Sequence, residues 1–138
     1  MKWFIKSGKS VNLNPSRYKI DWKRKVSGPQ LAVKNFLFKY WKHDLVLEEM
    51  VIPKTGGKRF DLVNLTTKTI IEVSPISVHL KYNEFMHGSE DGYLKKLKSD
   101  YDKMLVAELN KFKFIELHDN EINNLSKEML KEKFGLDL

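Results

Sequence analysis

The sequence predicts a single-domain, mixed α/β (α+β) fold with an α-β-β-β-α-β core and a C-terminal helix. Three observations support this: two long stretches with helical apolar spacing, three short strand-like stretches between them, and a fourth strand after the second helix. A length of 138 residues suits one domain with one core. We expect a basic N-terminal arm over residues 1–26, and a domain over residues 27–138 with a central mixed sheet flanked by helices.

The N-terminal arm is strongly basic. Before Ser27 it carries eight lysines and arginines and one acid, Asp21, with Trp3, Tyr18 and Trp22 interleaved. Such aromatic side chains can stack on nucleobases. They can equally pin the arm to the core, and for the tryptophans we favour this second interpretation.

The stretch "SGPQLAVKNFLFKYWKHD" predicts the first helix. Ser27 is the expected N-cap, and Gln30 three residues later matches a capping box. The stretches "DLVLEEMVIP", "RFDLVNL" and "KTIIEVSP" then predict three strands. The third is apolar on both faces, which favours a central position in the sheet.

The second half of the chain predicts a loop, a helix, a strand and a final helix. Residues 76–90 are expected to be a loop, and helical spacing of leucines predicts a helix from residue 91 or 92 to residue 110. "KFKFIEL" predicts the fourth strand, and "DNEINNLSKEMLKEKFGLDL" predicts one short amphipathic helix that stops at Gly135.

Composition narrows the class of protein. The chain has no cysteine, which excludes disulfides and thiolate metal sites and fits a reducing intracellular compartment. No apolar run reaches the ~20 residues of a membrane span, and we expect neither a membrane anchor nor a signal peptide.

Charge is unevenly distributed along the chain. Residues 1–60 hold 14 Lys and Arg against 4 Asp and Glu, whereas residues 61–138 hold 11 against 14. This asymmetry indicates a basic face for a polyanion, and we expect DNA as the partner. The residues expected to contact the DNA backbone are Lys19, Lys23, Arg24, Lys25, Lys54, Lys58 and Arg59.

Two acids interrupt the apolar hairpin "KRFDLVNLTTKTIIEVSP". Asp61 lies in its first strand and Glu72 in its second, and antiparallel pairing can bring the two carboxylates together. A buried glutamate is costly unless it is paired or binds a metal. Paired carboxylates are ligands that Mg²⁺ prefers, and a magnesium ion can activate water against a phosphodiester. The alternative is that each acid pairs with a lysine on the exposed face of an edge hairpin.

This motif, in this order of elements, resembles the PD-(D/E)XK nuclease superfamily over roughly residues 27–118. Phe60-Asp61 falls in the "PD" place and Glu72-Val73-Ser74 in the "E-x-K" place. The resemblance implies a metal held by Asp61, Glu72 and the carbonyl of Val73.

Two departures from the family pattern stand out. Ser74 occupies the lysine position and cannot supply a positive charge. The first helix offers Gln30 where many members carry a glutamate, and Gln30 would orient a water. Glu48 and Glu49 are the other candidates for a third carboxylate.

The following segment is similar to very-short-patch-repair-like and phage homing-type endonucleases. His79 falls near a histidine that this branch often uses as general base, and Lys96 or Lys103 could replace the missing lysine. The resemblance implies a Mg²⁺-dependent DNA endonuclease, with Mn²⁺ as substitute, that acts as a homodimer because cutting two strands needs two sites. The alternatives are an inactive nucleic-acid-binding protein on the same fold, which Ser74 and Gln30 favour, and a small basic protein-interaction module.

Overall fold

The computed structural model describes residues 1–75 and 90–138, with side chains described in the second range from residue 98 onward. Its centre is a four-stranded mixed sheet in the order β3 (Val46–Val51), β4 (Arg59–Asn64), β5 (Thr69–Val73) and β6 (Lys113–Leu117). The first three strands pair antiparallel and β5 pairs parallel with β6. The mixed α/β class and the interior position of the third predicted strand are confirmed.

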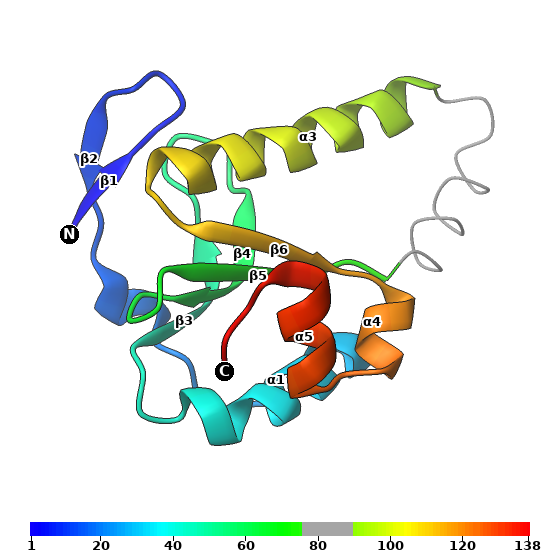
Figure 1. Ribbon diagram of the computed structural model, residues 1–138. Coiled ribbons are helices and arrows are strands. Elements are labelled where there is room, and N and C mark those ends of the chain that lie inside the picture. The colour runs from blue at the N-terminus through cyan, green and yellow to red at the C-terminus, as the bar shows by residue number, and fades with distance from the viewer. Residues whose placement is uncertain (76–89) are drawn as a thin grey trace.

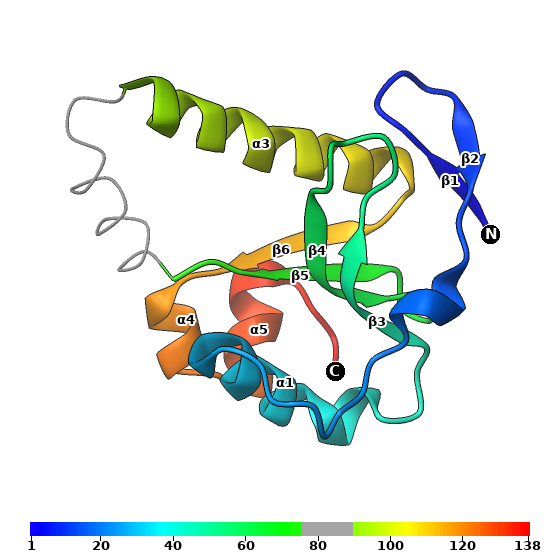
Figure 2. The ribbon, with the colours of Figure 1, turned by 180° about the vertical axis from the view of Figure 1, so that it is seen from behind.

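Helices cover both faces of this sheet (Figures 1 and 2). On one face α3 (Glu90–Leu109) places Val106 and Ala107 in a core with Leu47, Ile70 and other strand residues. On the opposite face α1 (Gly28–Trp41), α4 (Asp119–Asn123) and α5 (Lys127–Phe134) close a second core around Val33, Ile71 and Leu130. The two faces are therefore packed independently.

Residues 1–26 fold against the domain. Strands β1 (Lys2–Phe4) and β2 (Ser10–Asn12) form a hairpin beside the C-terminal end of α3, and the Phe4 backbone N–H donates to Asn110 Oδ1 at 2.8 Å (Figures 1 and 2). Trp3 is 1% exposed and joins the α3-side core. This tryptophan pins the segment, as its sequence context favours. A 3₁₀ turn, η1 (Pro15–Tyr18), then leads to a bridge between Lys19 and Leu47 that covers part of the free edge of β3.

The alternation of side chains along β3 and β4 breaks at Glu49. The backbone φ of Glu49 is +50°, an uncommon value for a residue other than glycine. Leu47 and Met50, three residues apart, both lie in the α3-side core, and so do Val63 and Phe60 on β4. Asp61 lies between the last two, where the strand changes the face that it presents.

Two local predictions are wrong. Ser27 is the N-cap of α1, but its side chain makes no capping hydrogen bond, and Gln30 is buried rather than folded back on the cap. The C-terminal segment forms two helices instead of one. The capping box lies at the start of α4, where the Glu121 carboxylate accepts from the His118 backbone N–H at 3.1 Å. Gly135 ends α5 in the left-handed conformation, as predicted.

Candidate functional site

Asp61 and Glu72 lie side by side where the pairing of β4 and β5 ends. The register Leu62↔Ile71 makes them the next residues along each strand. Each carboxylate accepts from a backbone amide of the opposite strand: the Asp61 N–H donates to Glu72 Oε1 at 3.0 Å, and the Val73 N–H donates to Asp61 Oδ2 at 2.8 Å. Beyond Leu62 and Ile71, the two carboxylates thus accept the hydrogen bonds of backbone amides on the opposite strand, and these hydrogen bonds fix the position of both side chains. The predicted juxtaposition is confirmed.

A lysine from α3 completes this group. Lys103 Nζ lies 3.2 Å from Glu72 Oε2, in a geometry that is both hydrogen bond and ion pair. Side-chain exposure is 19% for Lys103 and 7% for Glu72, so the pair is shielded from solvent. We refer to Asp61, Glu72 and Lys103 as the carboxylate–lysine cluster.

The Glu72 carboxyl is strongly perturbed. Its pKa is raised from 4.5 to about 7, first by burial and second by the nearby charge of Asp61, whereas Lys103 and the Asp61 amide oppose the rise. The charged form of Glu72 is therefore destabilised near neutral pH, and a further cation at the cluster would stabilise it.

The other acids proposed for this site are bound elsewhere. Glu48 points to the α1 side, where its Oε2 lies 2.7 Å from Lys34 Nζ and its Oε1 accepts from Arg24 at 2.8 Å. Arg24 Nη2 also donates to Glu49 Oε2 at 2.8 Å. The side chain of Lys34 is completely buried. These contacts make Glu48 and Glu49 members of a separate ion-pair network.

Gln30 does not join the cluster through any contact among the described residues. Its side chain is buried on α1, and its Nε2 has no hydrogen-bond partner in the described part of the chain. The water-orienting role predicted for Gln30 remains a prediction.

Ser74 directly follows β5, and a histidine that is not among the candidates predicted from the sequence lies next to it. His118 Nδ1 lies 2.8 Å from the Ser74 carbonyl oxygen. Because a carbonyl only accepts, Nδ1–H is the donor in this contact, and Nε2 lies 4.0 Å from Glu116 Oε1. The missed signal was topological: β6 runs parallel to β5 with Val73 opposite Leu117, so His118 had to emerge beside Ser74.

The remaining predicted catalytic residues cannot be placed. His79 lies outside the described residues, and the side chain of Lys96 does so as well.

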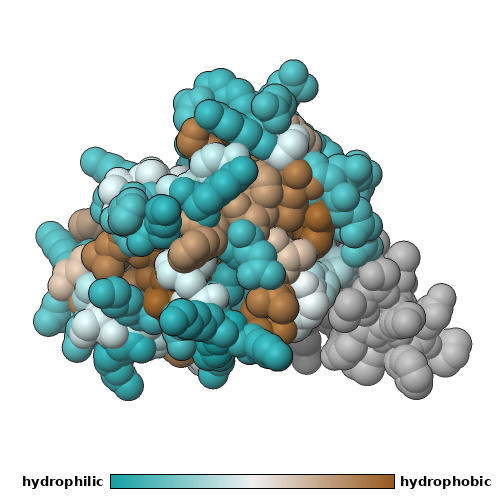
Figure 3. Space-filling model, turned by 90° about the horizontal axis from the view of Figure 1, so that it is seen from below, coloured by the Kyte–Doolittle hydropathy of each residue, from teal (hydrophilic) through white to brown (hydrophobic). Residues whose placement is uncertain are grey.

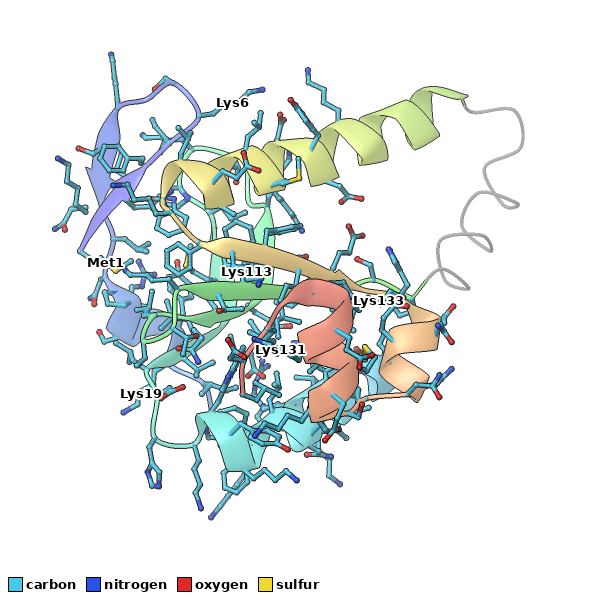
Figure 4. The ribbon with its side chains drawn as sticks, in the orientation of Figure 1. Met1, Lys6, Lys19, Lys113, Lys131 and Lys133 are labelled. Atoms are coloured by element: carbon cyan, nitrogen blue, oxygen red, sulfur yellow. The ribbon has the colours of Figure 1, made fainter. Side chains whose placement is uncertain are left out.

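The basic residues predicted to contact DNA fall into two groups. Arg24 forms salt bridges with Glu48 and Glu49. Lys58 Nζ lies 3.5 Å from Asp102, which also pairs with Lys6 in the loop between β1 and β2 (Figure 4). The others are exposed and make no salt bridge to a described residue: Lys19, Lys23, Lys25, Lys54 and Arg59. Lys19 projects outward from the segment beside β3 (Figure 4).

The donor set of the cluster is compatible with magnesium. Mg²⁺ is commonly held by one or two carboxylates with water in its other positions. Asp61 and Glu72 provide two such carboxylates. Among the described residues no group of three or more His, Cys, Asp and Glu side chains forms a metal site. Among the described residues, Asp61 and Glu72 are thus the carboxylates that would hold a cation here.

No protein-family model, curated protein or solved structure matches this chain. None of the helices in the described part of the chain combines the length and hydrophobicity needed to cross a bilayer.

Proposed function

We propose that this chain is a Mg²⁺-dependent endonuclease that hydrolyses phosphodiester bonds of DNA. The observation that carries the proposal is the carboxylate–lysine cluster: two carboxylates fixed by backbone amides, with one ammonium group 3.2 Å from the second of them. Asp61 and Glu72 would hold the metal ion, with Mn²⁺ as substitute. Bound there, the ion would activate water and neutralise charge on the phosphate.

The chain's own groups have distinct roles in this proposal. The amides of Asp61 and Val73 hold the carboxylates in place before substrate binds. Lys103 would supply the positive charge that Ser74 cannot, at a phosphate whose negative charge grows in the transition state. Among the exposed basic residues, Lys19, Lys23, Lys25, Lys54 and Arg59 would hold the DNA backbone.

A cleavage assay tests the proposal. Supercoiled plasmid is incubated with the protein and Mg²⁺, Mn²⁺ or EDTA, and nicked and linear products are measured. Asp61→Asn is expected to abolish cleavage without weakening DNA binding, because it removes a metal ligand and a negative charge. Full activity of Asp61→Asn would sink the nuclease assignment.

Lys103 allows a matched comparison on one helix. Lys103→Met is expected to reduce turnover by about 10²–10³-fold, the usual range for one oriented donor at a developing charge. Lys98 is exposed on the same helix, and Lys98→Met should cleave at the parental rate. Equal rates for the two variants would remove Lys103 from the proposed mechanism.

A second candidate is a nucleic-acid-binding protein without catalysis. One observation favours it: both carboxylate oxygens of Glu72 already have donors, namely the Asp61 amide and Lys103, so Glu72 is compensated from within the chain. Salt-sensitive DNA binding with no cleavage under any metal would support this candidate. Absence of both binding and cleavage would favour a protein-interaction module.

We also propose a homodimer, since double-strand cleavage with one site per chain needs two copies. Light scattering after size exclusion would measure the mass in solution. A strict monomer that linearises plasmid in a single encounter would contradict the dimer.

A further inference from the structure

An aromatic hollow lies beside the first helix. It has a volume of about 510 Å³ and is lined by Ile20, Asp21, Trp22, Lys23, Asn35 and Phe38. The rings of Trp22 and Phe38 meet edge to face, with centroids 5.5 Å apart at an interplanar angle of 68°. Phe38 is 45% exposed, an unusual fraction for a phenylalanine on a helix that packs against a core. Seen from the side of α1, the molecule exposes hydrophobic surface between hydrophilic side chains (Figure 3).

A second, polar hollow adjoins it. Its volume is about 350 Å³, and its lining includes Arg17, Lys19, Arg59 and the same Asp21 that lines the aromatic hollow. Glu48 and Glu49 also line it, but their charge is compensated by Lys34 and Arg24. The three cations Arg17, Lys19 and Arg59 make no salt bridge to any residue that the structure describes. With Asp21 as the further carboxylate of the lining, this surface therefore carries net positive charge.

The polar hollow also reaches the strand of the candidate site. Arg59 opens β4, two residues before Asp61. The polar hollow thus contains three cations, and the aromatic hollow, which shares Asp21 with it, contains two rings. An apolar peptide would satisfy the rings but would leave the cations without partners.

We infer that these two hollows bind a single-stranded segment of nucleic acid, with phosphates on Arg17, Lys19 and Arg59 and one unpaired base against Trp22 and Phe38. Every base has a flat π-face that stacks on an aromatic side chain, whereas in a duplex these faces are covered by neighbouring base pairs. Lys23 at the rim adds a further contact for the next phosphate. The inference rests on the proposed function and narrows its substrate to nucleic acid with an unpaired stretch.

Binding measured in EDTA tests this without cleavage. The probes are fluorescein-labelled oligothymidylate of twelve nucleotides and a twelve-base-pair duplex, followed by anisotropy and by tryptophan emission. Trp3 and Trp41 are 1% and 2% exposed, so Trp22 is the tryptophan that a stacked base can reach. We expect the single strand, but not the duplex, to quench the emission, and Trp22→Phe to keep the affinity but lose the quenching.

Phe38→Ala provides the decisive variant because its ring is half-exposed and its removal should leave the fold intact. We expect it to bind oligothymidylate about 5-fold or more weakly, in line with the stacking of one base, and to bind the duplex as the parent does. Tyr101→Ala, which removes an exposed ring on α3, is the matched control and should bind both probes normally.

Two results would overturn the inference: an unchanged affinity of Phe38→Ala for the single strand, or binding of the single strand by the parent without quenching of tryptophan emission. The hollow would then be assigned to a side chain of a protein partner. The two proposals fail separately. If the protein cleaves plasmid but Phe38→Ala binds oligothymidylate as the parent does, only the proposed base-binding site is wrong. If oligothymidylate quenches the emission but no cleavage occurs, only the proposed nuclease activity is wrong.

Discussion

Replacing Glu72 with glutamine should change how stability depends on pH. In the folded chain the pKa of Glu72 is raised from 4.5 to about 7, chiefly by burial. Below pH 4.5 the carboxyl is neutral both folded and unfolded. As the pH rises toward 7 the unfolded chain releases this proton first, so the folded state loses stability over that interval and levels off above it. Glutamine has no such proton to lose.

The expected magnitude follows from the size of the displacement. One pKa unit corresponds to about 1.36 kcal/mol, so a rise from 4.5 to about 7 corresponds to roughly 3 kcal/mol of unfolding free energy. Urea unfolding in EDTA at pH 4.5, 5.5, 6.5 and 8 measures it for parent and Glu72→Gln. The glutamine amide also meets Lys103 less well than the carboxylate does, but that cost does not depend on pH and cancels in the comparison.

The result that would refute this reasoning is a difference between parent and variant that stays constant from pH 4.5 to 8. A constant difference would mean that the carboxyl titrates in the folded chain as it does in water, and so that it is neither desolvated nor close to the charge of Asp61. A difference that widens with pH in favour of the variant would support both causes.

Three further outcomes are expected. Lys103→Met should extend the upper end of the pH interval over which Glu72 costs stability to higher pH, because the ammonium lowers the pKa of that carboxyl in the folded chain; the same urea series measures it, and an unchanged upper end would contradict the ion pair. Lys34→Met should lower the free energy of unfolding by about 3 kcal/mol by leaving Glu48 buried with only Arg24, and adding Glu48→Leu should restore most of the loss; a double variant no better than the single one would argue against a buried ion pair. Gly135→Ala should lower stability by about 1 kcal/mol in thermal unfolding, because φ is +67° and a Cβ would lie 3.0 Å from Lys113 Nζ; an unchanged melting temperature would mean that the cap is not strained.

One experiment suggested by the sequence needs redesign. Deleting residues 1–25 is a natural test of a flexible basic arm, with a flatter salt dependence as its result. Trp3 and Leu13 are 1% and 5% exposed and belong to the α3-side core, so the deletion would remove core residues together with charge. Neutralising Arg17, Lys19 and Arg59 instead should reduce the slope of log affinity against log salt by about 0.7 for each single-strand phosphate that these side chains no longer neutralise.

Local sequence patterns predicted the helices and strands, because each type of element has its own spacing of apolar residues and is bounded by residues such as proline and glycine. The strands were bounded by Pro53, Gly56, Gly57 and Pro75, and β5 was recognised as interior from "TIIEV" alone. The capping box was misplaced because Ser27 and Gln30 have the right spacing, whereas the box forms at His118 and Glu121, where no serine or threonine marks it. Sequence spacing makes a cap possible, but the burial of Gln30 prevents it from forming at α1.

The candidate site was predictable only in part. The proximity of Asp61 and Glu72 could be predicted, because a short turn joins their strands and so determines which residues lie opposite each other. Glu48 was a reasonable third carboxylate by proximity in sequence, but the strand turns it toward Lys34 on the other side of the sheet. The Glu49 backbone, with φ at +50°, changes the face that β3 presents, and no periodic pattern anticipates such a break.

The position of Lys103 depends on how α3 packs rather than on β5. A lysine two residues after Glu72 would be placed by the strand itself, but Ser74 stands there. Val106 and Ala107 follow Lys103 by three and four residues, so they share its side of the helix, and both are buried against the strand face that carries Ile70 and Glu72. The packing of Val106 and Ala107 against the sheet thus also positions the Lys103 ammonium group next to Glu72. Packing in this core and the charge state of Glu72 are for this reason linked, and a change that shifts α3 should alter the pKa of Glu72 without touching either charged residue.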